Sequence, residues 1–349
     1  FFEDRRSIVL KKFIFNFSNK KPKKNFNAKT VLGGKGANLA EMEKLGLPVP
    51  PGFTISTKVC DLFYKNKKKL PSFIIKLIKK ELKLIEKASK KKFGDLNNPL
   101  LVSVRSGAKV SMPGMMDTIL NLGLNDKTVL ALSKKTSNPR FARDSYRRFL
   151  QMYSSVVLNI KSYHFEELIE NYKLTKGVIA DKDLDENDWS GLINNFKDLI
   201  KKETKKDFPQ DVLEHLYGAI SAVFLSWESK RAKVYRRLHH ISEDWGTAVN
   251  IQSMVFGNMG NDSATGVVFT RNPSTGEKFL FGEYLINAQG EDIVAGTRTP
   301  LHITKKARIK DGVKEPSMEE SMTKVYLQLK KILFPGKRFF GPRFVWGTK

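Results

Sequence analysis

The 349-residue sequence has a single cysteine, Cys60, and no long apolar run. One cysteine excludes a disulfide within the chain and favours a reducing compartment, which we take to be the cytoplasm. Cys60 itself is expected to be a small buried hydrophobe, because no activating partner surrounds it in the sequence. No stretch approaches the ~18 uncharged apolar residues that a membrane helix requires. Residues 1–15 are charged at both ends and lack a small-residue cleavage site, so they make a poor signal peptide.

Acidic residues are scarce, with 36 Asp and Glu against 62 Lys and Arg, and the formal net charge is +26. Such a charge is typical of nucleic-acid binding. However, the excess lies mainly in lysine-rich stretches at 1–30, 58–92 and 301–349, and no zinc-finger, helix-turn-helix or RNA-recognition pattern accompanies it. We interpret it as solvated surface and keep nucleic-acid binding as a less favoured alternative.

Hydrophobic residues make up 40% of the chain and include 24 Phe, which indicates a folded protein. The hydrophobic period is helical in the first part of the chain and changes to two at Ala248. This change predicts an α+β protein in which a mostly helical part is followed by a sheet. The expected helices are 70–92, 138–158, 162–173, 185–203 and 211–229, and the expected strands are 13–17, 53–55, 100–104, 248–257, 266–270 and 279–286.

The segment 100–123 reads LLVSVRSGAKVSMPGMMDTILNLG and has a pattern suited to phosphate binding. A predicted buried strand is followed by Arg105 and then by a loop that contains Gly107 and Gly114. Glycine lets backbone N–H groups approach an anion, and a guanidinium matches phosphate oxygens. A surface turn with a solvated arginine is the alternative that this pattern alone leaves open.

A second candidate is the run Gly33–Gly36, which reads GGKG and precedes the helical pattern Leu39, Met42, Leu45. It combines flexible backbone, a helix N-terminus and the Lys35 ammonium, which together suit phosphate oxygens. The spacing is not that of a P-loop.

Four blocks in this order resemble the N-terminal nucleotide-binding domain of the pyruvate, phosphate dikinases, an ATP-grasp module. The blocks are GGKGANLAEMEKLGLPVPPGF, SVRSGAKVSMPGMMDTILNLGLND, NPRFARDSYRRFLQMY and TRNPSTGEKFLFGEYLINAQGEDIVAGTRTP. The resemblance runs from about residue 12 to residue 300 and covers only the first part of a family enzyme. Phosphoenolpyruvate synthase and the glucan dikinases share the chemistry, but the MPGMMDTILNLG block is most similar to the pyruvate, phosphate dikinases.

The resemblance implies that Lys35 and Arg105 contact the ATP phosphates. It also implies that the loop Ser106–Met116 folds over them, with Gly114 in close backbone contact, and that Arg148 of DSYRRF helps to bind phosphate. The implied cofactors are ATP and Mg²⁺, with no metal ligands that we can name. Further residues implied to bind or line the nucleotide cleft are Gly107, Ser111, Gln252, Thr270, Glu283 and Glu291.

The expected organisation is an N-terminal ATP-grasp subdomain with a helical insert and a C-terminal sheet subdomain. After residue 300 the family has a strand with an Asp-x-Glu pair and a Leu-Gln-Thr-Arg strand, and neither is found here. The tail from about 333 therefore resembles unrelated sequence, such as a frameshift or gene split would create. The expected boundaries are 12–124 (N-terminal subdomain), 125–210 (insert), 211–247 (returning helix), 248–332 (incomplete C-terminal subdomain) and 333–349 (tail).

The resemblance implies the nucleotide half-reaction of a dikinase that converts ATP, phosphate and pyruvate to AMP, diphosphate and phosphoenolpyruvate. The phosphohistidine and pyruvate-binding domains are missing, so a separate chain is a possible partner, and family members form homodimers. An inactive remnant of a split gene is the main alternative. We expect no nucleic-acid or membrane partner.

Overall fold

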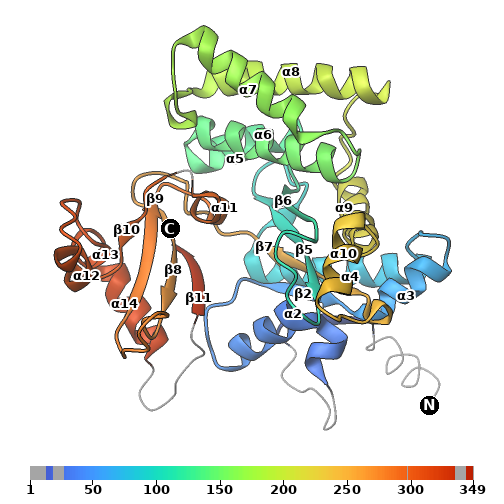
Figure 1. Cartoon of the computed structure of the whole chain (residues 1–349). Coiled ribbons are helices and arrows are strands. Elements are labelled where there is room, and N and C mark those ends of the chain that lie inside the picture. The colour runs from blue at the N-terminus through green and yellow to red at the C-terminus, as the bar shows by residue number, and fades with distance from the viewer. Residues whose placement is uncertain (1–12, 19–26, 297, 335–342, 349) are drawn as a thin grey trace. The chain divides into compact units, whose positions relative to one another are not determined.

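The computed structural model describes residues 13–18, 27–296, 298–334 and 343–348. Helices and mainly antiparallel sheets alternate along the chain (Figure 1). The chain divides into two compact units, with the first ending at Met254 and the second beginning at Val255. In the described part of the chain, no helix is both long and apolar enough to cross a bilayer.

The first unit is built on a five-stranded antiparallel sheet in the order β1-β2-β7-β5-β6. Its strands are β1 (Ile14–Asn16), β2 (Gly52–Ile55), β5 (Val102–Ala108), β6 (Thr118–Leu122) and β7 (Thr247–Ser253). The sequence led us to place 248 onward with the second subdomain. Instead, β7 is the middle strand of the first sheet, because its backbone groups pair with β2 on one side and β5 on the other.

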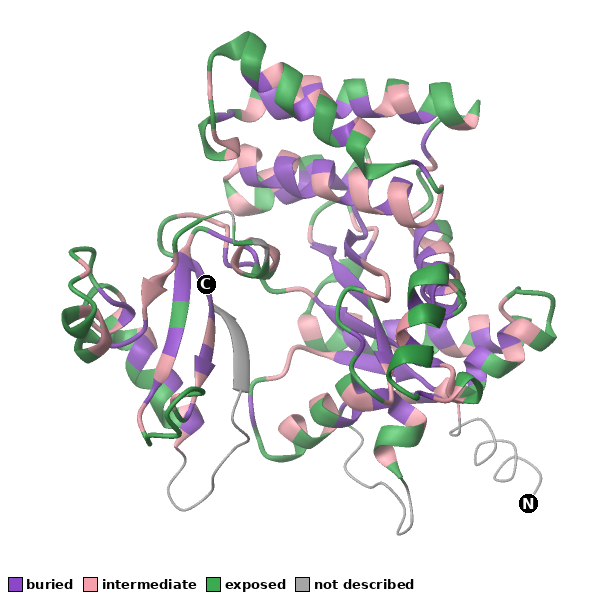
Figure 2. Cartoon of the chain, viewed as in Figure 1, coloured by how far each residue is buried: buried purple, intermediate pink, exposed green. Residues whose placement is uncertain are grey.

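The two faces of this sheet differ in polarity. One face carries apolar side chains that are completely buried, among them Phe53, Val104 and Ile251. Figure 2 shows that the strands of this sheet consist largely of buried residues. The other carries Thr54 and Asn250, and the Thr54 hydroxyl donates a hydrogen bond to Asn250 Oδ1 at 2.7 Å. Helix α2 (Ala28–Lys44) packs on this polar face. The first unit also contains α3 (Thr57–Lys65), α4 (Ser72–Ser89), α9 (Val212–Ser226) and α10 (Lys230–Leu238).

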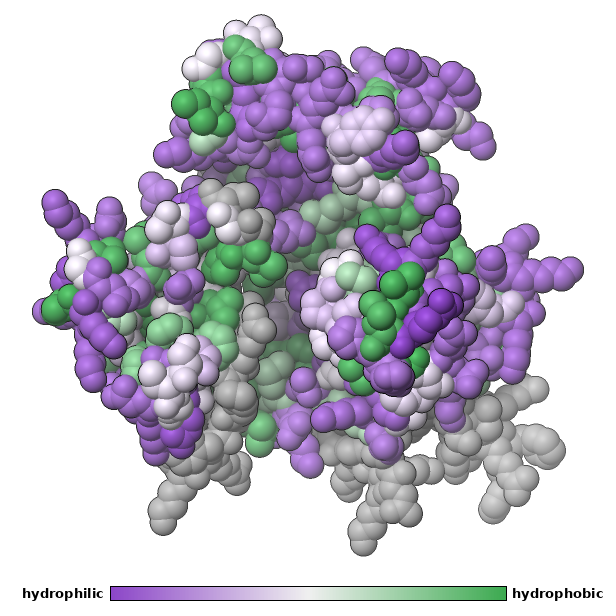
Figure 3. Space-filling view, viewed as in Figure 1, coloured by the Kyte–Doolittle hydropathy of each residue, from purple (hydrophilic) through white to green (hydrophobic). Residues whose placement is uncertain are grey.

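Four helices between β6 and α9 form a helical layer of their own (Figure 1). They are α5 (Thr128–Thr136), α6 (Pro139–Val156), α7 (Ser162–Lys176) and α8 (Glu186–Thr204). Helix α6 is central, since it contacts α5, α7, α8 and β6. Asn138 caps its start by accepting from the backbone N–H of Phe141, and Asp185 closes a capping box at the start of α8. The surfaces of α7 and α8 in view are largely hydrophilic (Figure 3).

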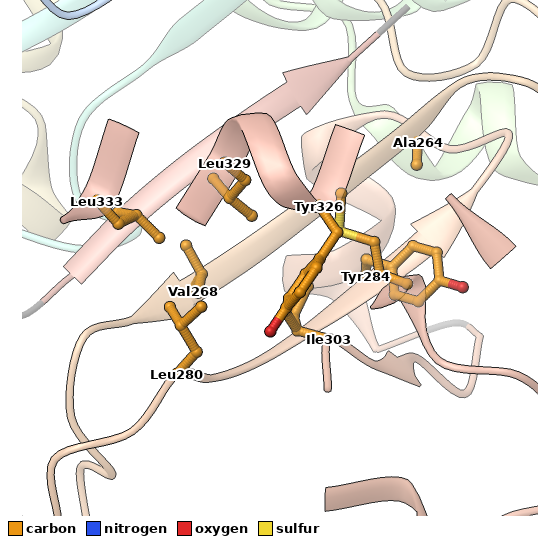
Figure 4. Packing of buried hydrophobic residues seen from close by; sticks show 9 residues of the cluster. Ala264, Val268, Leu280, Tyr284, Ile303, Tyr326, Leu329 and Leu333 are labelled. Atoms are coloured by element: carbon orange, nitrogen blue, oxygen red, sulfur yellow. The ribbon is translucent and has the colours of Figure 1, made fainter. Parts of the chain in front are cut away.

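The second unit has a four-stranded antiparallel sheet in the order β10-β9-β8-β11. Its elements are β8 (Ala264–Phe269), β9 (Phe281–Ile286), α11 (Gly290–Ala295), β10 (Leu301–His302), α12 (Lys305–Lys310), α13 (Met318–Ser321), α14 (Thr323–Leu333) and β11 (Arg343–Thr348). Side chains of β8, β9 and α14 form one apolar cluster that includes Val268, Tyr284 and Leu329 (Figure 4). Within the stretch expected to be an atypical tail, the described residues 343–348 pair with β8.

The remaining short elements are β3 (Lys92–Phe93), β4 (Pro99–Leu100), and the 3-10 turns η1 (Asp181–Asp183) and η2 (Glu243–Trp245). Cys60 is buried, as expected of a small hydrophobe.

Substitution Phe196→Ala should destabilise the first unit, because the ring is fully buried and lies 4.8 Å from that of Phe165. Removing a buried phenyl ring costs about 3–5 kcal/mol. The matched control is Leu174→Ala in the same helical layer, because Leu174 is 77% exposed. This control should change the free energy of unfolding by at most about 0.5 kcal/mol. Urea unfolding compares the two, and equal losses would contradict this packing.

Candidate functional site

Helix α2 contains a break at Gly33, where φ is +68° and ψ is 172°. Gly34, Lys35 and Gly36 therefore form the first turn of a new helical segment. N–H groups in a first helical turn have no partner inside the helix, and they lie at the positive end of the helix dipole. The sequence predicted a helix N-terminus at GGKG. It did not predict the helical residues that precede the break.

The break lies directly against the end of β5. A Cβ atom at position 33 would overlap the backbone carbonyl of Gly107, so the two backbones are closer than any side chain at position 33 would allow. A Cβ at position 34 would lie 3.6 Å from the carbonyl oxygens of Ala108 and Lys109, an ordinary contact. The new helical segment thus starts where β5 gives way to the glycine-bearing loop.

Lys35 and Arg105 come together at this junction. Although the Lys35 side chain still reaches solvent, the protein atoms around its ammonium lower its pKa from the usual value, and the nearby Arg105 guanidinium lowers it further. Both influences oppose the positive charge of Lys35. Two cations beside a helix N-terminus and a glycine backbone make an arrangement that suits a polyanion.

The polar face of the sheet, on which α2 packs, lies next to the junction of Lys35 and Arg105. A Cβ atom at position 36 would lie 2.7 Å from the Thr54 hydroxyl and 2.8 Å from Asn250 Oδ1. Asn250 is buried, and in the described residues its Nδ2 has no hydrogen-bond partner. Gln252, which we expected to line the cleft, lies two residues further along β7 and donates to the Pro50 carbonyl at 3.2 Å.

Sequence reasoning did not single out Thr54 or Asn250. A signal was present for Asn250, because Asn250 and Gln252 are spaced by two in a strand and so lie on one face. A buried polar pair at this spacing, alternating with Val249 and Ile251, marks a face that is not ordinary core. For Thr54 the sequence holds no comparable signal, since its partner is 196 residues away.

Ser111 and Gly114 lie on the loop between β5 and β6, and both are exposed. Gly107 belongs to β5, where its N–H donates to the Thr247 hydroxyl at 3.3 Å. These three residues share one segment with Arg105, as the sequence required. Their contact with a nucleotide stays a prediction.

Arg148 lies on α6 in a buried cluster of charges. Asp144, also buried, accepts from Arg148 Nε at 3.1 Å and from Arg147 at 2.5 Å. These two cations, with Arg140 further away, lower the pKa of the Asp144 carboxyl although burial alone would raise it. The charge of Arg148 is thus partly compensated by Asp144, and a phosphate contact by its remaining N–H groups stays a prediction.

The other three expected residues lie in the second unit. Thr270 follows β8 and is buried, Glu283 is exposed on β9, and Glu291 is in the first turn of α11. On β9, Glu283 lies on the face opposite to Tyr284, which packs in the core. Their role in a nucleotide site also stays a prediction.

The chain matches known proteins over most of its length. Residues 29–83 and 67–333 match the family described as "Pyruvate phosphate dikinase, AMP/ATP-binding domain". The chain is 50% identical over 321 residues to a pyruvate, phosphate dikinase of Rhizobium meliloti, and this alignment covers 92% of this chain and 36% of that protein. It is 56% identical over 282 residues to the enzyme of Clostridium symbiosum, with coverage of 80% and 32%. A chloroplastic pyruvate, phosphate dikinase of Flaveria trinervia is 53% identical over 290 residues, with coverage of 83% and 30%.

These matches define an AMP/ATP-binding domain. The chain belongs to the pyruvate phosphate dikinase AMP/ATP-binding domain family. It spans about a third of the length of the curated relatives it matches.

Substitution Gly33→Ala should destabilise the first unit by several kcal/mol, because it adds left-handed backbone strain to an overlap with Gly107. The control is Gly46→Ala, where φ is +80° and no atom lies within 4 Å of the added Cβ; strain alone costs about 1–2 kcal/mol. Thermal unfolding of both variants measures the difference. If Gly33→Ala costs no more than the control, the two backbones are not in contact.

Substitution Lys35→Met should raise the free energy of unfolding at neutral pH, since the lowered pKa means that the folded state disfavours the charged ammonium. This penalty is complete below the lowered pKa and disappears as pH rises through it towards the usual 10.5. The gain of the variant over the parent should therefore shrink with rising pH. Lys44→Met removes the same charge from the exposed end of α2 and is the matched control in urea unfolding at several pH values.

Proposed function

We propose that the first unit binds the phosphate chain of ATP between the helix segment that starts after Gly33 and the end of β5. The observation that carries the proposal is geometric: Gly36, next to Lys35, packs over Asn250, and Arg105 of β5 lies in register with the same Asn250. Two like charges held close to each other repel, and a bound polyanion would add attractive interactions with both that offset this repulsion. Membership of an AMP/ATP-binding family supports the nucleotide as that anion.

The same geometry suits phosphoryl transfer, in which positioning and charge neutralisation do most of the catalytic work. Lys35 and Arg105 would hold and neutralise phosphate oxygens, and backbone N–H groups of Gly34, Lys35 and Gly36 would add donors. The loop Ser106–Met116 would cover the phosphates, and Arg148 would contribute a further contact. Removal of one such cation would cost about 3 kcal/mol of transition-state stabilisation.

We also propose that the α+β architecture is an ATP-grasp fold with the helices α5–α8 as its insert. The resemblance supports this organisation, and the expected boundaries at 12–124, 125–210 and 211–247 stay part of the proposal, with β7 added to the first unit and the C-terminal subdomain beginning at Val255. So do nucleotide contacts by Gln252 of the first unit and by Thr270, Glu283 and Glu291 of the second.

Mg²⁺ enters the proposal as part of the substrate MgATP. In the residues that the structure describes, no three His, Cys, Asp or Glu side chains form a group that could hold a metal ion. The described side chains alone therefore do not fit a resident magnesium site. Magnesium commonly takes most of its ligands from water and substrate phosphates, so no step here is assigned to a protein-bound metal.

In a complete enzyme, we propose that this domain uses ATP and phosphate to phosphorylate a histidine on another domain, with release of AMP and diphosphate. The curated relatives are named pyruvate, phosphate dikinases, and phosphoenolpyruvate formation is proposed on that basis. A separate chain with the phosphohistidine and pyruvate-binding domains is a candidate partner, and homodimer formation is carried over from the family. A cytoplasmic location stays a prediction, because one relative is described as chloroplastic.

Isothermal titration should show magnesium-dependent ATP binding by the chain, and Lys35→Met or Arg105→Met should weaken it at least about 100-fold, since each removes a cation close to the phosphates. Lys44→Met, which removes a charge from the exposed end of α2, should bind as the parent does.

An inactive remnant would show no ATP binding in any variant. A nucleic-acid-binding protein would instead bind duplex DNA with a steep salt dependence. Binding of ATP that is unaffected by both Lys35→Met and Arg105→Met would refute the assigned site.

A further inference from the structure

The loop Lys109–Asp117, here called the glycine loop, joins β5 to β6. Its tip, Pro113 and Gly114, is exposed, whereas both flanks, 109–112 and 115–117, are fastened to elements much later in the chain. A loop with fixed flanks has fewer conformations to lose when its tip binds a ligand. The fixed flanks should therefore increase the affinity of the tip for an anion, because less conformational entropy is lost on binding.

The C-terminal flank is clamped by Arg231 of α10. Arg231 Nε donates to the Met115 carbonyl at 3.2 Å, and the same guanidinium forms an ion pair with Asp117. The Asp117 N–H donates to the hydroxyl of Ser226 at 3.4 Å. One planar guanidinium thus fixes two positions of the loop at once, which a lysine cannot do with the same geometry.

The N-terminal flank is held by aromatic and apolar contacts. Met112 is 6% exposed and packs in a cluster with Trp227, Ala232 and Ile241. Lys109 places its Nζ 4.0 Å from the centre of the Trp245 ring, within the range of a cation–π interaction. These contacts come from the α9–α10 turn, α10 and η2, the same region that supplies Arg231.

Asp117 depends on its arginine partner. Burial raises the pKa of this carboxyl, and Arg231 acts in the opposite direction through its charge and its hydrogen bond. A partly buried carboxylate that loses its counter-ion is destabilised and moves towards water. Loss of Arg231 should therefore release the C-terminal flank of the loop and leave Met112 in place.

We propose that Arg231 is a positioning residue that preorganises the tip of the glycine loop for the phosphate chain of the nucleotide, by clamping Met115 and Asp117 to α10. This inference rests on the proposed function, because it assigns the tip to the same phosphate site. Arg231 acts through the loop backbone, so its loss should weaken only the binding of those phosphates that the loop covers.

The test compares Arg231→Met with Arg237→Met, which removes the same group from an exposed position on α10. Titration of the full chain with MgATP and with AMP should show about tenfold weaker ATP binding for Arg231→Met and less than about twofold change for AMP. Hydrogen exchange of the amides from Ser111 to Met116 should accelerate in this variant only. Arg231→Lys, which keeps the ion pair with Asp117 and loses the fork, should be intermediate.

Equal losses for ATP and AMP, or equal losses in both methionine variants, would overturn the inference, as would unchanged hydrogen exchange. If Arg231→Met does not fold, Arg231→Lys gives the same comparison with the charge retained. The failure of the proposed function looks different: the parent chain would then bind no ATP. ATP binding that requires Lys35 and Arg105 but is unaffected by Arg231→Met would overturn this inference alone.

Discussion

The contact between the backbones of Gly33 and Gly107 is the constraint on which the first unit depends. Position 33 has no room for a side chain, and its lack of one lets the broken helix α2 lie directly on the end of β5. The same approach places Lys35 beside Arg105, and Gly36 over the Thr54–Asn250 pair. Glycine is needed here for the distance between two chain segments as much as for its backbone conformation.

The two groups of cations in the first unit are stabilised in different ways. In the helical layer, Arg147 and Arg148 lie against the buried Asp144, so that opposite charges compensate one another. At the α2–β5 junction, both influences on Lys35 work against its charge. The first arrangement stabilises the fold as it stands. The second holds the charge of Lys35 at a cost in free energy, which the polyanion of the proposed function would offset.

Much of the secondary structure could be predicted from the sequence, because hydrophobic period and turn residues are local signals. The helices expected at 70–92, 138–158 and 185–203 are confirmed as α4, α6 and α8, with ends shifted by one to three residues. The first half of α2 was not predicted, because three glycines, which have a low helix propensity, lie in the middle of this helix. The place of β7 in the first sheet and the clamp by Arg231 depend on contacts between distant segments, which no local pattern contains. Lys35 and Arg105 could be found because each lies in a motif of its own.

The position of β7 has a consequence for how the protein is made. Strands β2 and β5 leave the ribosome early, but the strand that joins them into one sheet ends at residue 253. Until then each has an unpaired edge facing the place that β7 will fill, and such edges invite pairing with other chains. The high contact order of this sheet predicts slow folding, and during synthesis the helical layer can form before the sheet that supports it is closed.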